Sequence, residues 1–556
     1  MALSILSHSV IWDGFRTGTV KSEIISETVS RGVYDKKLYV CCGGELAGVK
    51  AFVEITGRTS PEKLPAVMVI GDLKEKQDVA FTEKLVSIGY AVAYVDVAGE
   101  NPEKEYYTVY PEEKAYANYK DGSVNLYGGF ENEKKVCWFT WVKVCKSVIK
   151  YLSGLPYING IGGFASGEAA TALWQLAAVE PALSCAVFVG NAGWQSYRGT
   201  DKFSDDEPAF SDEALAVIAD IEAQSYAKRV KCPSLLLSAI GDKNCDFDRA
   251  YDTMARISEK TYKATLYSFK RESVSETAFT DVKLFFEKFL KKDPAVEIAD
   301  EAGFQLLREN GKVIAEATLN TKNPESVRFY YSEGQVSPEK RFYETLVGEE
   351  VKSGVKYRAR IPVGKGAGIV AAFVSVKYAN GFCVSSDVES LKIPEGEGEE
   401  PSKSGVVYSS REVSRSVFFP LKEEYGSSRI DFKGDNAVKK KSGPMGVDGV
   451  YCKNGIATFK INGEKLRPDH DSILMFDAYA KTDVKLRISL FADFTEERIE
   501  YSETVSVKGG QVWRNFRLDN RRFKTEGGMP LKNYGKIDAV AFLSDGECLI
   551  NNVLWV

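Results

Sequence analysis

Gly160-Ile161-Gly162-Gly163-Phe164-Ala165-Ser166-Gly167 is the stretch that decides how the first half of this chain is interpreted. Its glycine spacing matches the Gly-x-Ser-x-Gly turn between a strand and a helix, in which a sharply bent backbone presents a serine as nucleophile. Between Gly163 and Gly167, the serine position holds Ala165. Because a methyl group cannot attack a carbonyl, the pattern predicts the architecture of this turn without its chemistry.

The residues around this stretch alternate short apolar runs with helical patterns, which predicts a mostly parallel sheet with helices on both faces. The expected strands are residues 37–42, 48–56, 66–70, 91–95, 159–164, 185–189, 234–239 and 265–269. The expected helices are residues 78–88, 138–153, 166–179, 211–223, 249–258 and 277–290. This α/β domain is expected to span residues 1–293, with residues 1–35 as an N-terminal arm or leading strand.

Residues 294–556 lose the helical period and predict two all-β units. Strands expected at 312–319, 326–332, 343–347, 354–362, 369–378 and 383–385 predict a small β-sandwich over residues 294–393. The acidic stretch 394–404 lacks large apolar residues and is expected to be a flexible linker. In residues 405–556, apolar and polar residues alternate along 484–490 as in a half-buried strand, and a jelly-roll sandwich fits best.

Composition excludes several classes of partner. The 556 residues carry a formal net charge of −5 and no basic stripe, so neither a nucleic-acid nor a membrane partner is expected. No apolar run reaches the roughly 18 residues of a membrane span, and the first residues do not have the pattern of a signal peptide. The ten cysteines form no CxxC pair, and several lie in apolar runs. A cytoplasmic location is therefore expected.

Histidine is scarce, since only His8 and His470 occur in the chain. Zinc sites in proteins usually combine several His or Cys ligands at close spacing, and no such spacing is present in the sequence. No cofactor is therefore expected. Any mechanism that uses a histidine base must use one of these two residues.

Residues 37–290 resemble the α/β-hydrolase superfamily, particularly its acetyl-xylan-esterase-like and dienelactone-hydrolase-like branches. The likeness is carried by residues 64–71, 89–96, 160–174, 185–194 and 233–241, which follow one another in the order usual for the superfamily. The resemblance implies a nucleophile, an acid and a histidine in that order along the chain. It also implies an oxyanion loop after the third strand of the fold.

The implied catalytic positions are degenerate. Ala165 occupies the nucleophile position, and Asn244 occupies the acid position. A shifted frame with Ser166 as nucleophile would place Phe164 and Glu168 where the tight turn needs glycines. Ser166 is therefore expected to cap the helix that follows.

The loops that should carry the acid and the base contain other carboxylates that bear on these two roles. The carboxylates near the acid position are Asp242, Asp246 and Asp248, any of which is close enough to substitute. The stretch 270–278, where the histidine is implied, contains none. Its Glu272 and Glu276 are interpreted as solvated loop carboxylates.

Three further residues bear on the chemistry. Cys245 lies on the acid loop, but no histidine is near in sequence to activate its thiol, so a structural role is favoured. His470 has carboxylate neighbours but lies two domains away, which favours a surface loop. Asp72 follows Gly71 where the oxyanion loop usually carries His-Gly, and a carboxylate there would oppose a developing oxyanion.

The β units carry weaker resemblances. Residues 294–393 resemble immunoglobulin or fibronectin-type modules, on residues 328–332 and 376–386. Residues 405–556 resemble carbohydrate-binding modules of the galactose-binding-like jelly-roll class, on residues 513–518, 537–542 and 549–555. That resemblance implies sugar stacking on exposed aromatic rings, although aromatics at alternate sandwich positions are more often core. The candidates are Trp513, Tyr479, Phe491 and Tyr534, with Asp431 and Asp435 as candidate ligands of an implied structural calcium.

Two functions remain open at this level. The first is a catalytically inactive, α/β-hydrolase-derived pseudoenzyme that acts as a binding or self-assembling structural component, with a glycan or further copies of itself as partner. The alternative is an active carbohydrate esterase or related hydrolase with a displaced catalytic set. That set would use Ser166 or Cys245 with a carboxylate base.

Overall fold

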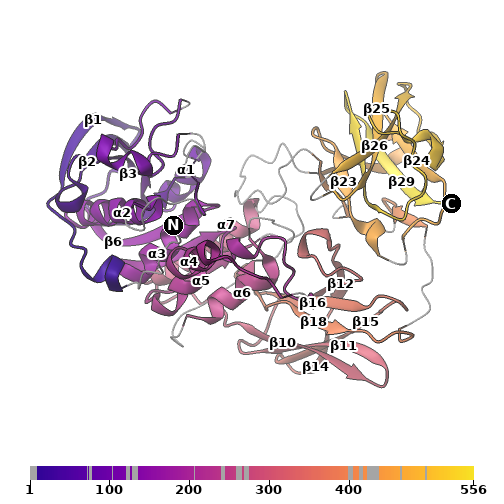
Figure 1. Ribbon diagram of the computed structural model, residues 1–556, viewed down its shortest axis with the longest axis horizontal. Coiled ribbons are helices and arrows are strands. Elements are labelled where there is room, and N and C mark those ends of the chain that lie inside the picture. The colour runs from indigo at the N-terminus through magenta and orange to yellow at the C-terminus, as the bar shows by residue number, and fades with distance from the viewer. Residues whose placement is uncertain are drawn as a thin grey trace.

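The computed structural model describes residues 9–71, 73, 78–102, 104–120, 125–127, 135–205, 207–238, 245–257, 266–267, 275–398, 405–411, 417–421, 438–463, 466–494 and 498–556. Three structural units follow one another along the chain (Figure 1). We call them the N-terminal domain (1–293), the middle sandwich (294–393) and the C-terminal sandwich (405–556).

The N-terminal domain contains a nine-stranded sheet in the order β1-β2-β3-β5-β4-β6-β7-β8-β9. Its strands are β1 (Lys21–Ser30), β2 (Val33–Cys41), β3 (Lys50–Arg58), β4 (Leu64–Ile70), β5 (Ala91–Val95), β6 (Ile158–Ser166), β7 (Leu183–Val189), β8 (Ser234–Leu237) and β9 (Leu266–Tyr267). The first three strands pair antiparallel, and all neighbours from β5 to β9 are parallel. An antiparallel β3 beside the exchanged β5–β4 pair is the strand order of the α/β-hydrolase fold, so the predicted fold class is confirmed.

Helices cover both faces of this sheet. Alternate residues of its central strands point to opposite faces, and they belong to two separate apolar clusters. One cluster contains α2 (Cys137–Ser153), α3 (Ala169–Val179) and α6 (Phe247–Ala255), and the other contains α1 (Val79–Ser87) and α7 (Ser275–Phe289). Two further helices are α4 (Asp212–Asp220) and α5 (Ala223–Tyr226). No helix among the described residues combines the length and the apolarity needed to cross a bilayer.

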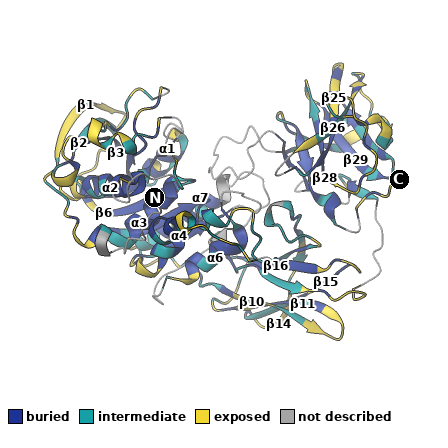
Figure 2. Cartoon of the chain, in the orientation of Figure 1, coloured by how far each residue is buried: buried dark blue, intermediate teal, exposed yellow. Residues whose placement is uncertain are grey.

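The segment expected to be an N-terminal arm or leading strand contributes β1, an outer strand that is exposed along nearly its whole length (Figure 2). Two predicted helices differ from the observed ones. The helix expected over 211–223 ends at Asp220 and is followed by the separate helix α5. The helix expected to begin at residue 166 begins at Ala169 instead, because β6 continues through Ser166. The second difference moves the turn on which the functional interpretation rests.

The middle sandwich consists of two antiparallel sheets, in the orders β10-β11-β15-β14 and β13-β12-β16-β17, with β18 also pairing with β16. Its strands are β10 (Ala302–Glu309), β11 (Lys312–Leu319), β12 (Ser326–Glu333), β13 (Glu344–Val347), β14 (Glu349–Lys352), β15 (Lys356–Ile361), β16 (Ile369–Lys377), β17 (Cys383–Ser385) and β18 (Glu389–Lys392). Alternate buried residues of β11, β12 and β16 form its apolar core. The predicted all-β class of this unit is confirmed.

The acidic stretch expected to be flexible makes two contacts with the middle sandwich at its beginning. The carboxylate of Glu397 lies 3.0 Å from the Arg308 guanidinium. A Cβ added at Gly398 would lie 2.8 Å from the carbonyl oxygen of Gly364, so the two backbones are in close contact. Residues 394–398 are nonetheless all exposed, and residues 399–404 lie outside the described residues, so the linker over 394–404 stays a prediction.

The C-terminal sandwich also has two antiparallel sheets. One has the order β21-β22-β29-β24-β27, with β19 pairing with β29, and the other has the order β20-β23-β28-β25-β26. The strands are β19 (Val406–Tyr408), β20 (Phe419–Pro420), β21 (Lys439–Ser442), β22 (Asp448–Tyr451), β23 (Ile456–Thr458), β24 (Leu474–Tyr479), β25 (Val484–Ala492), β26 (Ile499–Val507), β27 (Arg514–Leu518), β28 (Ile537–Ser544) and β29 (Leu549–Trp555). This confirms the predicted all-β sandwich.

A short segment between β12 and β13 contacts both neighbouring units. Arg341 and Tyr343 are buried, and Tyr343 belongs to the apolar core of the N-terminal domain. Phe342 packs instead against the apolar clusters of the C-terminal sandwich, and Lys340 Nζ lies 2.9 Å from Asp493 Oδ1 of that unit. Because neighbouring residues of an extended chain point to opposite sides, one segment can hold two units at once.

Candidate functional site

The turn after β6 lies two residues later than the sequence pattern indicates. Ala165 pairs with Phe188 and Ser166 with Val189, so the strand is still regular at both positions. Gly167 has a φ of 58°, in the left-handed region, and α3 begins two residues later. Because the sharp bend of a nucleophile elbow lies at the nucleophile itself, the structural equivalent of the serine is Gly167, and the prediction of Ala165 is corrected.

Gly163, which the sequence pattern takes as the first glycine of the turn motif, has a packing role instead. A Cβ added at Gly163 would lie 2.5 Å from Leu173 Cδ1 of α3, so glycine there lets the helix pack closely on the strand. The small residues that flank the actual turn are Ala165 and Ala169, both fully buried. The motif therefore consists of residues 165–169, centred on Gly167.

The corrected frame still provides no nucleophile at the turn. Gly167 has no side chain, and the methyl group of Ala165 is buried in the core. Ser166 is half-buried on the strand. It does not cap α3 as predicted, because the N-cap residue is Glu168, whose side chain makes no capping hydrogen bond.

Glu168 instead belongs to a polar network beside the turn. Tyr127 donates a hydrogen bond from its hydroxyl to Glu168 Oε2, and the Arg198 guanidinium lies 3.5 Å from Glu168 Oε1. Burial, followed by the nearby Glu168 carboxylate, raises the pKa of Tyr127 well above its ordinary value. The Tyr127 hydroxyl is also 3.5 Å from Thr171 Oγ1, which accepts a hydrogen bond from Asn191 Nδ2. The network holds the Glu168 carboxylate in place beside the turn.

The loop after β8, where the acid is implied, is only partly described. Asn244 and Asp242 lie outside the described residues. Cys245 is fully buried, with its Sγ 3.3 Å from Ser238 Oγ, so the thiol faces the interior. Asp246 pairs with Arg249, and burial, with the Asp248 charge as the next cause, raises the pKa of Asp246.

Asp248, in the first turn of α6 just after this loop, is held by an arginine from another unit. Arg341 Nη1 lies 2.6 Å from Asp248 Oδ1 and Nη2 lies 2.9 Å from Oδ2, which is a bidentate pair. Both side chains are completely buried, and Arg341 Nη1 also donates to the Tyr343 hydroxyl at 3.2 Å. Sequence reasoning missed Arg341, because nothing near it in sequence indicates a partner 93 positions away.

The implied base and oxyanion positions add no catalytic group among the described residues. Residues 270–274 and Asp72 lie outside them, as do His8 and the side chain of Glu276. The His470 side chain is 73% exposed in the C-terminal sandwich, and its Nδ1 lies 3.8 Å from Asp471. No group of three or more His, Cys, Asp or Glu side chains within the described parts of the chain could hold a metal ion.

The aromatic candidates of the C-terminal sandwich are mostly core residues. The exposed fractions of Tyr479, Phe491 and Tyr534 are 6%, 2% and 1%, so none of them offers a ring face to a sugar. This corrects the prediction for these three. Trp513 is half-buried and remains a candidate. The candidate calcium ligands Asp431 and Asp435 lie outside the described residues.

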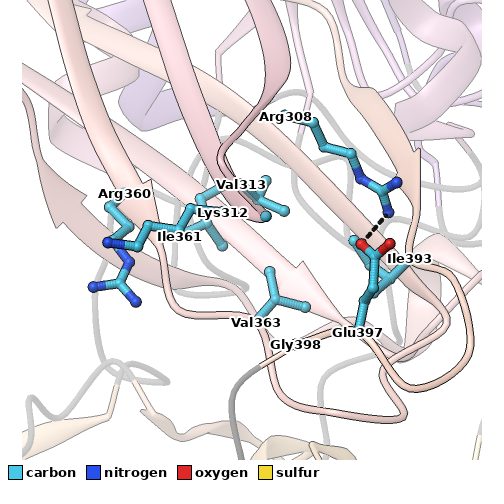
Figure 3. A pocket seen from close by; sticks show the side chains of 10 residues that line it. Arg308, Lys312, Val313, Arg360, Ile361, Val363, Ile393, Glu397 and Gly398 are labelled. Atoms are coloured by element: carbon cyan, nitrogen blue, oxygen red, sulfur yellow. Dashed lines mark ion pairs between the residues drawn. The ribbon is translucent and has the colours of Figure 1, made fainter.

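A shallow, solvent-open pocket lies on the middle sandwich, far along the chain from these positions. Figure 3 shows the Arg308–Glu397 ion pair at one side and Lys312 and Arg360 at the other. Its apolar lining comes from the core of the sandwich, including Val313. The pocket includes none of the predicted site residues, and it presents no nucleophile.

No family model and no curated protein matches this sequence. Among solved structures, acetyl xylan esterase 1 from Thermoanaerobacterium sp. is 15% identical over 45% of this chain and 82% of its own length, with a TM-score of 0.33. The acetyl xylan esterase from Paenibacillus sp. R4 is 10% identical over 51% of this chain and 92% of its own, with a TM-score of 0.38. Est1E from Butyrivibrio proteoclasticus, solved with ferulic acid, is 15% identical over 40% of this chain and 87% of its own, with a TM-score of 0.29. At this similarity no activity transfers to this chain, which on its own strand order has an α/β-hydrolase-like N-terminal domain followed by β-sandwich units.

Proposed function

We propose that this chain is a catalytically inactive, hydrolase-derived protein with a binding or self-assembling structural role. The observation that carries the proposal is the turn between β6 and α3. Its left-handed residue is Gly167, and the residue at the pattern-predicted position is Ala165. Acyl transfer by this fold needs a nucleophile at the turn, and neither residue can form the covalent intermediate.

The contacts of the residues near the implied acid position support the same proposal. Asp248 is bound bidentately by Arg341 in a fully buried pair, so it is not available to orient a base. Cys245, the fallback nucleophile, is fully buried. A displaced catalytic set built on Cys245 would therefore have to disrupt the core to reach substrate.

The proposal is tested with an acyl-ester panel containing p-nitrophenyl acetate, acetylated xylan and methyl ferulate. The intact chain and a Ser166→Ala/Cys245→Ala double variant should both be inactive, and a fluorophosphonate probe should label neither. Turnover by the intact chain that the double variant loses would instead establish the displaced-site esterase.

Self-association is supported by the free edge of the nine-stranded sheet. β1 is an outermost strand, and Ile24 and Val29 on it are 56% and 65% exposed. Exposed strand edges are templates for pairing with a second chain. Size-exclusion chromatography with light scattering should give a mass above one chain, and a strict monomer at all concentrations would remove the self-assembly version.

We also propose a reducing, cytoplasmic environment for this protein. None of the ten cysteines, which all lie among the described residues, forms a disulfide, and nine of them are buried, where they pack as small apolar side chains. A thiol titration in denaturant should count ten free thiols on protein purified from the cytoplasm. A lower count would argue for an oxidising compartment.

A further inference from the structure

Strand β1 is the outermost strand of the nine-stranded sheet, and its outer side has no strand partner among the described residues. It lies at the margin of the N-terminal domain in Figure 1 and is exposed along nearly its whole length in Figure 2. Because its residues pair only with β2, about half of their backbone N–H and C=O groups face solvent. Such an edge matches the hydrogen-bonding pattern of another extended strand.

The turn that follows β1 determines which of its residues face outward. The two turn residues, 31–32, have positive φ values of 50° and 74°, as in a type I′ turn. Such a turn is closed by a hydrogen-bonded pair, which here is Ser30 with Val33. Hydrogen-bonded and non-hydrogen-bonded pairs alternate along an antiparallel ladder. Glu27 and Val29 therefore direct their N–H and C=O groups away from β2.

A register shift in the middle of β1 reverses this alternation. The pairing with β2 shifts between Ile24 and Ser26, so Ile25 is an extra residue of the β-bulge type. On the N-terminal side of the shift, the residues that face outward are therefore Ser22 and Ile24.

The same shift places the two exposed apolar side chains of β1 on one face of the sheet. Ile24 lies opposite Leu38, which is fully buried in the apolar cluster that contains α2. Val29 lies opposite Tyr34, which packs against that cluster. Because Leu38 and Tyr34 are four residues apart on β2, they share a face. Ile24 and Val29, which are 56% and 65% exposed, continue this apolar face beyond the part that helices cover.

Both acidic side chains of β1 have a counter-ion within the chain. Glu23 Oε2 lies 2.8 Å from Lys50 Nζ, and Glu27 Oε2 lies 3.3 Å from Lys36 Nζ. The hydrogen bond from Lys50 lowers the pKa of Glu23. Charges on an edge strand ordinarily keep other strands away. Because each carboxylate of β1 is paired with a lysine of its own sheet, the repulsion between two copies of this strand is reduced.

We propose that β1 pairs with β1 of a second copy of this chain, antiparallel about a two-fold axis. Outward residues of one strand must then face outward residues of the other. Only one two-fold register satisfies this for all four outward residues. It places Ser22 opposite Val29 of the second copy, and Ile24 then lies opposite Glu27. This inference rests on the proposed self-assembling role of the chain and names the partner, the symmetry and the register.

This register also fits the bulge and the charges of β1. The extra residue Ile25 of each strand falls at the centre of the pairing, so both strands have the same number of residues there. No like charges lie directly opposite each other, a placement that would weaken the pairing. The exposed Ile24 and Val29 side chains of both copies line one face of the new strand pair, where their burial favours association.

The symmetry of this contact limits the size of the assembly. A two-fold interface uses the same surface of both copies, so it closes on itself. Each copy then has no free β1 edge for a third. The assembly formed through β1 is therefore a dimer in which two nine-stranded sheets are continuous, rather than a filament.

The test is size-exclusion chromatography with light scattering on the full chain over a wide range of concentration, and the mass of two chains is expected. Val29→Pro removes an outward N–H but no hydrogen bond to β2. This variant should have the mass of one chain and keep the far-ultraviolet circular dichroism spectrum of the parent. Val79→Pro is the matched control, because Val79 is 60% exposed at the first position of α1, where proline fits a helix. The control should remain a dimer.

Charge changes at Thr28 test the register without a change to the backbone. In the proposed register Thr28 lies opposite Glu23 of the second copy, and this pair occurs twice in the dimer. Thr28→Glu places like charges opposite each other and should raise the dissociation constant of the dimer by about tenfold. Thr28→Lys places opposite charges there and should lower it by a similar factor. Equal dissociation constants for the two variants would contradict the register.

Three outcomes overturn the inference. A monomer at every concentration leaves the β1 edge open to a strand of another protein. A dimer that survives in folded Val29→Pro places the contact elsewhere in the chain, and a mass well above two chains contradicts the closed two-fold contact. None of these outcomes concerns catalysis, whereas ester turnover in the same preparations would overturn the proposed inactivity and leave the dimer unaffected.

Discussion

At the scale of single residues, the buried pair of Arg341 and Asp248 links the N-terminal domain to the middle sandwich. Because both side chains are fully buried, removing one partner leaves a charge without solvent or counter-ion. Arg341→Met should therefore lower the free energy of unfolding by about 3–5 kcal/mol, measured by urea denaturation.

The control for this prediction is an exposed pair that joins the same two units. Lys392 and Asp205 are 68% and 88% exposed, so Lys392→Met should change stability by no more than about 0.5 kcal/mol. If the two variants proved equally stable, Asp248 would have to be solvated or otherwise paired in solution. The conclusion that Asp248 is held by Arg341 and is unavailable to orient a base would then fail.

Asp538 makes stability depend on pH in the mildly acidic range. Burial, the largest cause, raises its pKa from 3.8 to about 6, although its carboxylate accepts the Phe494 N–H. Because the folded state holds this proton more tightly than the unfolded state, stability falls as pH rises from about 4 to about 6 and stays lower above that range.

The variant that isolates this effect is Asp538→Asn, which is neutral at every pH and keeps an acceptor for Phe494. Its melting temperature should exceed that of the parent at about pH 7.5 and match it at about pH 4. Asp471→Asn, which removes the same charge from a side chain that is 95% exposed, should show no such difference. An equal Asp538→Asn effect at both pH values would contradict the raised pKa.

At the scale of elements, the β6–α3 connection depends on one backbone conformation. Gly167 has a φ of 58°, and L-residues in this region lose about 1–2 kcal/mol. Gly167→Ala should destabilise the protein by that amount in equilibrium unfolding. Gly14→Ala, where an added Cβ has open space, should be close to neutral. A neutral Gly167→Ala would show that the turn is elsewhere, and Ala165 would regain the nucleophile position.

At the scale of the whole molecule, the N-terminal domain is completed by the middle sandwich. Tyr343 and Phe373 of the sandwich belong to the same apolar cluster as the parallel sheet, and Phe373 packs edge-on against Phe247 at 5.3 Å. Cutting the chain at residue 293 would expose this apolar surface and leave Asp248 unpaired.

A fragment of residues 1–293 should therefore be poorly soluble and melt without a cooperative transition, whereas residues 1–398 should fold. Soluble yield and thermal melting by circular dichroism measure the difference. A cooperative transition for residues 1–293 near that of the full chain would show that the two units are energetically independent.

Much of the architecture could be predicted from the sequence, because it depends on the periodic spacing of apolar residues along short segments. The run 484–490 alternates apolar and polar residues, and β25 shows the same alternation of buried and exposed positions at its start. The candidate site was less accessible, because glycine spacing alone does not say which glycine bends the chain. Gly163 and Gly167 look equivalent in sequence, yet one accommodates Leu173 and the other forms the turn.

The sequence by itself determined the α/β and all-β classes of the units and the absence of a serine in the elbow pattern, because these follow from residue type and short-range period. Only the tertiary structure decided that Gly167 is the turn residue and that Arg341 forms an ion pair with Asp248. The physical reason is that such contacts join residues distant in sequence. Their partners are selected by strand register and domain packing, which no local pattern encodes.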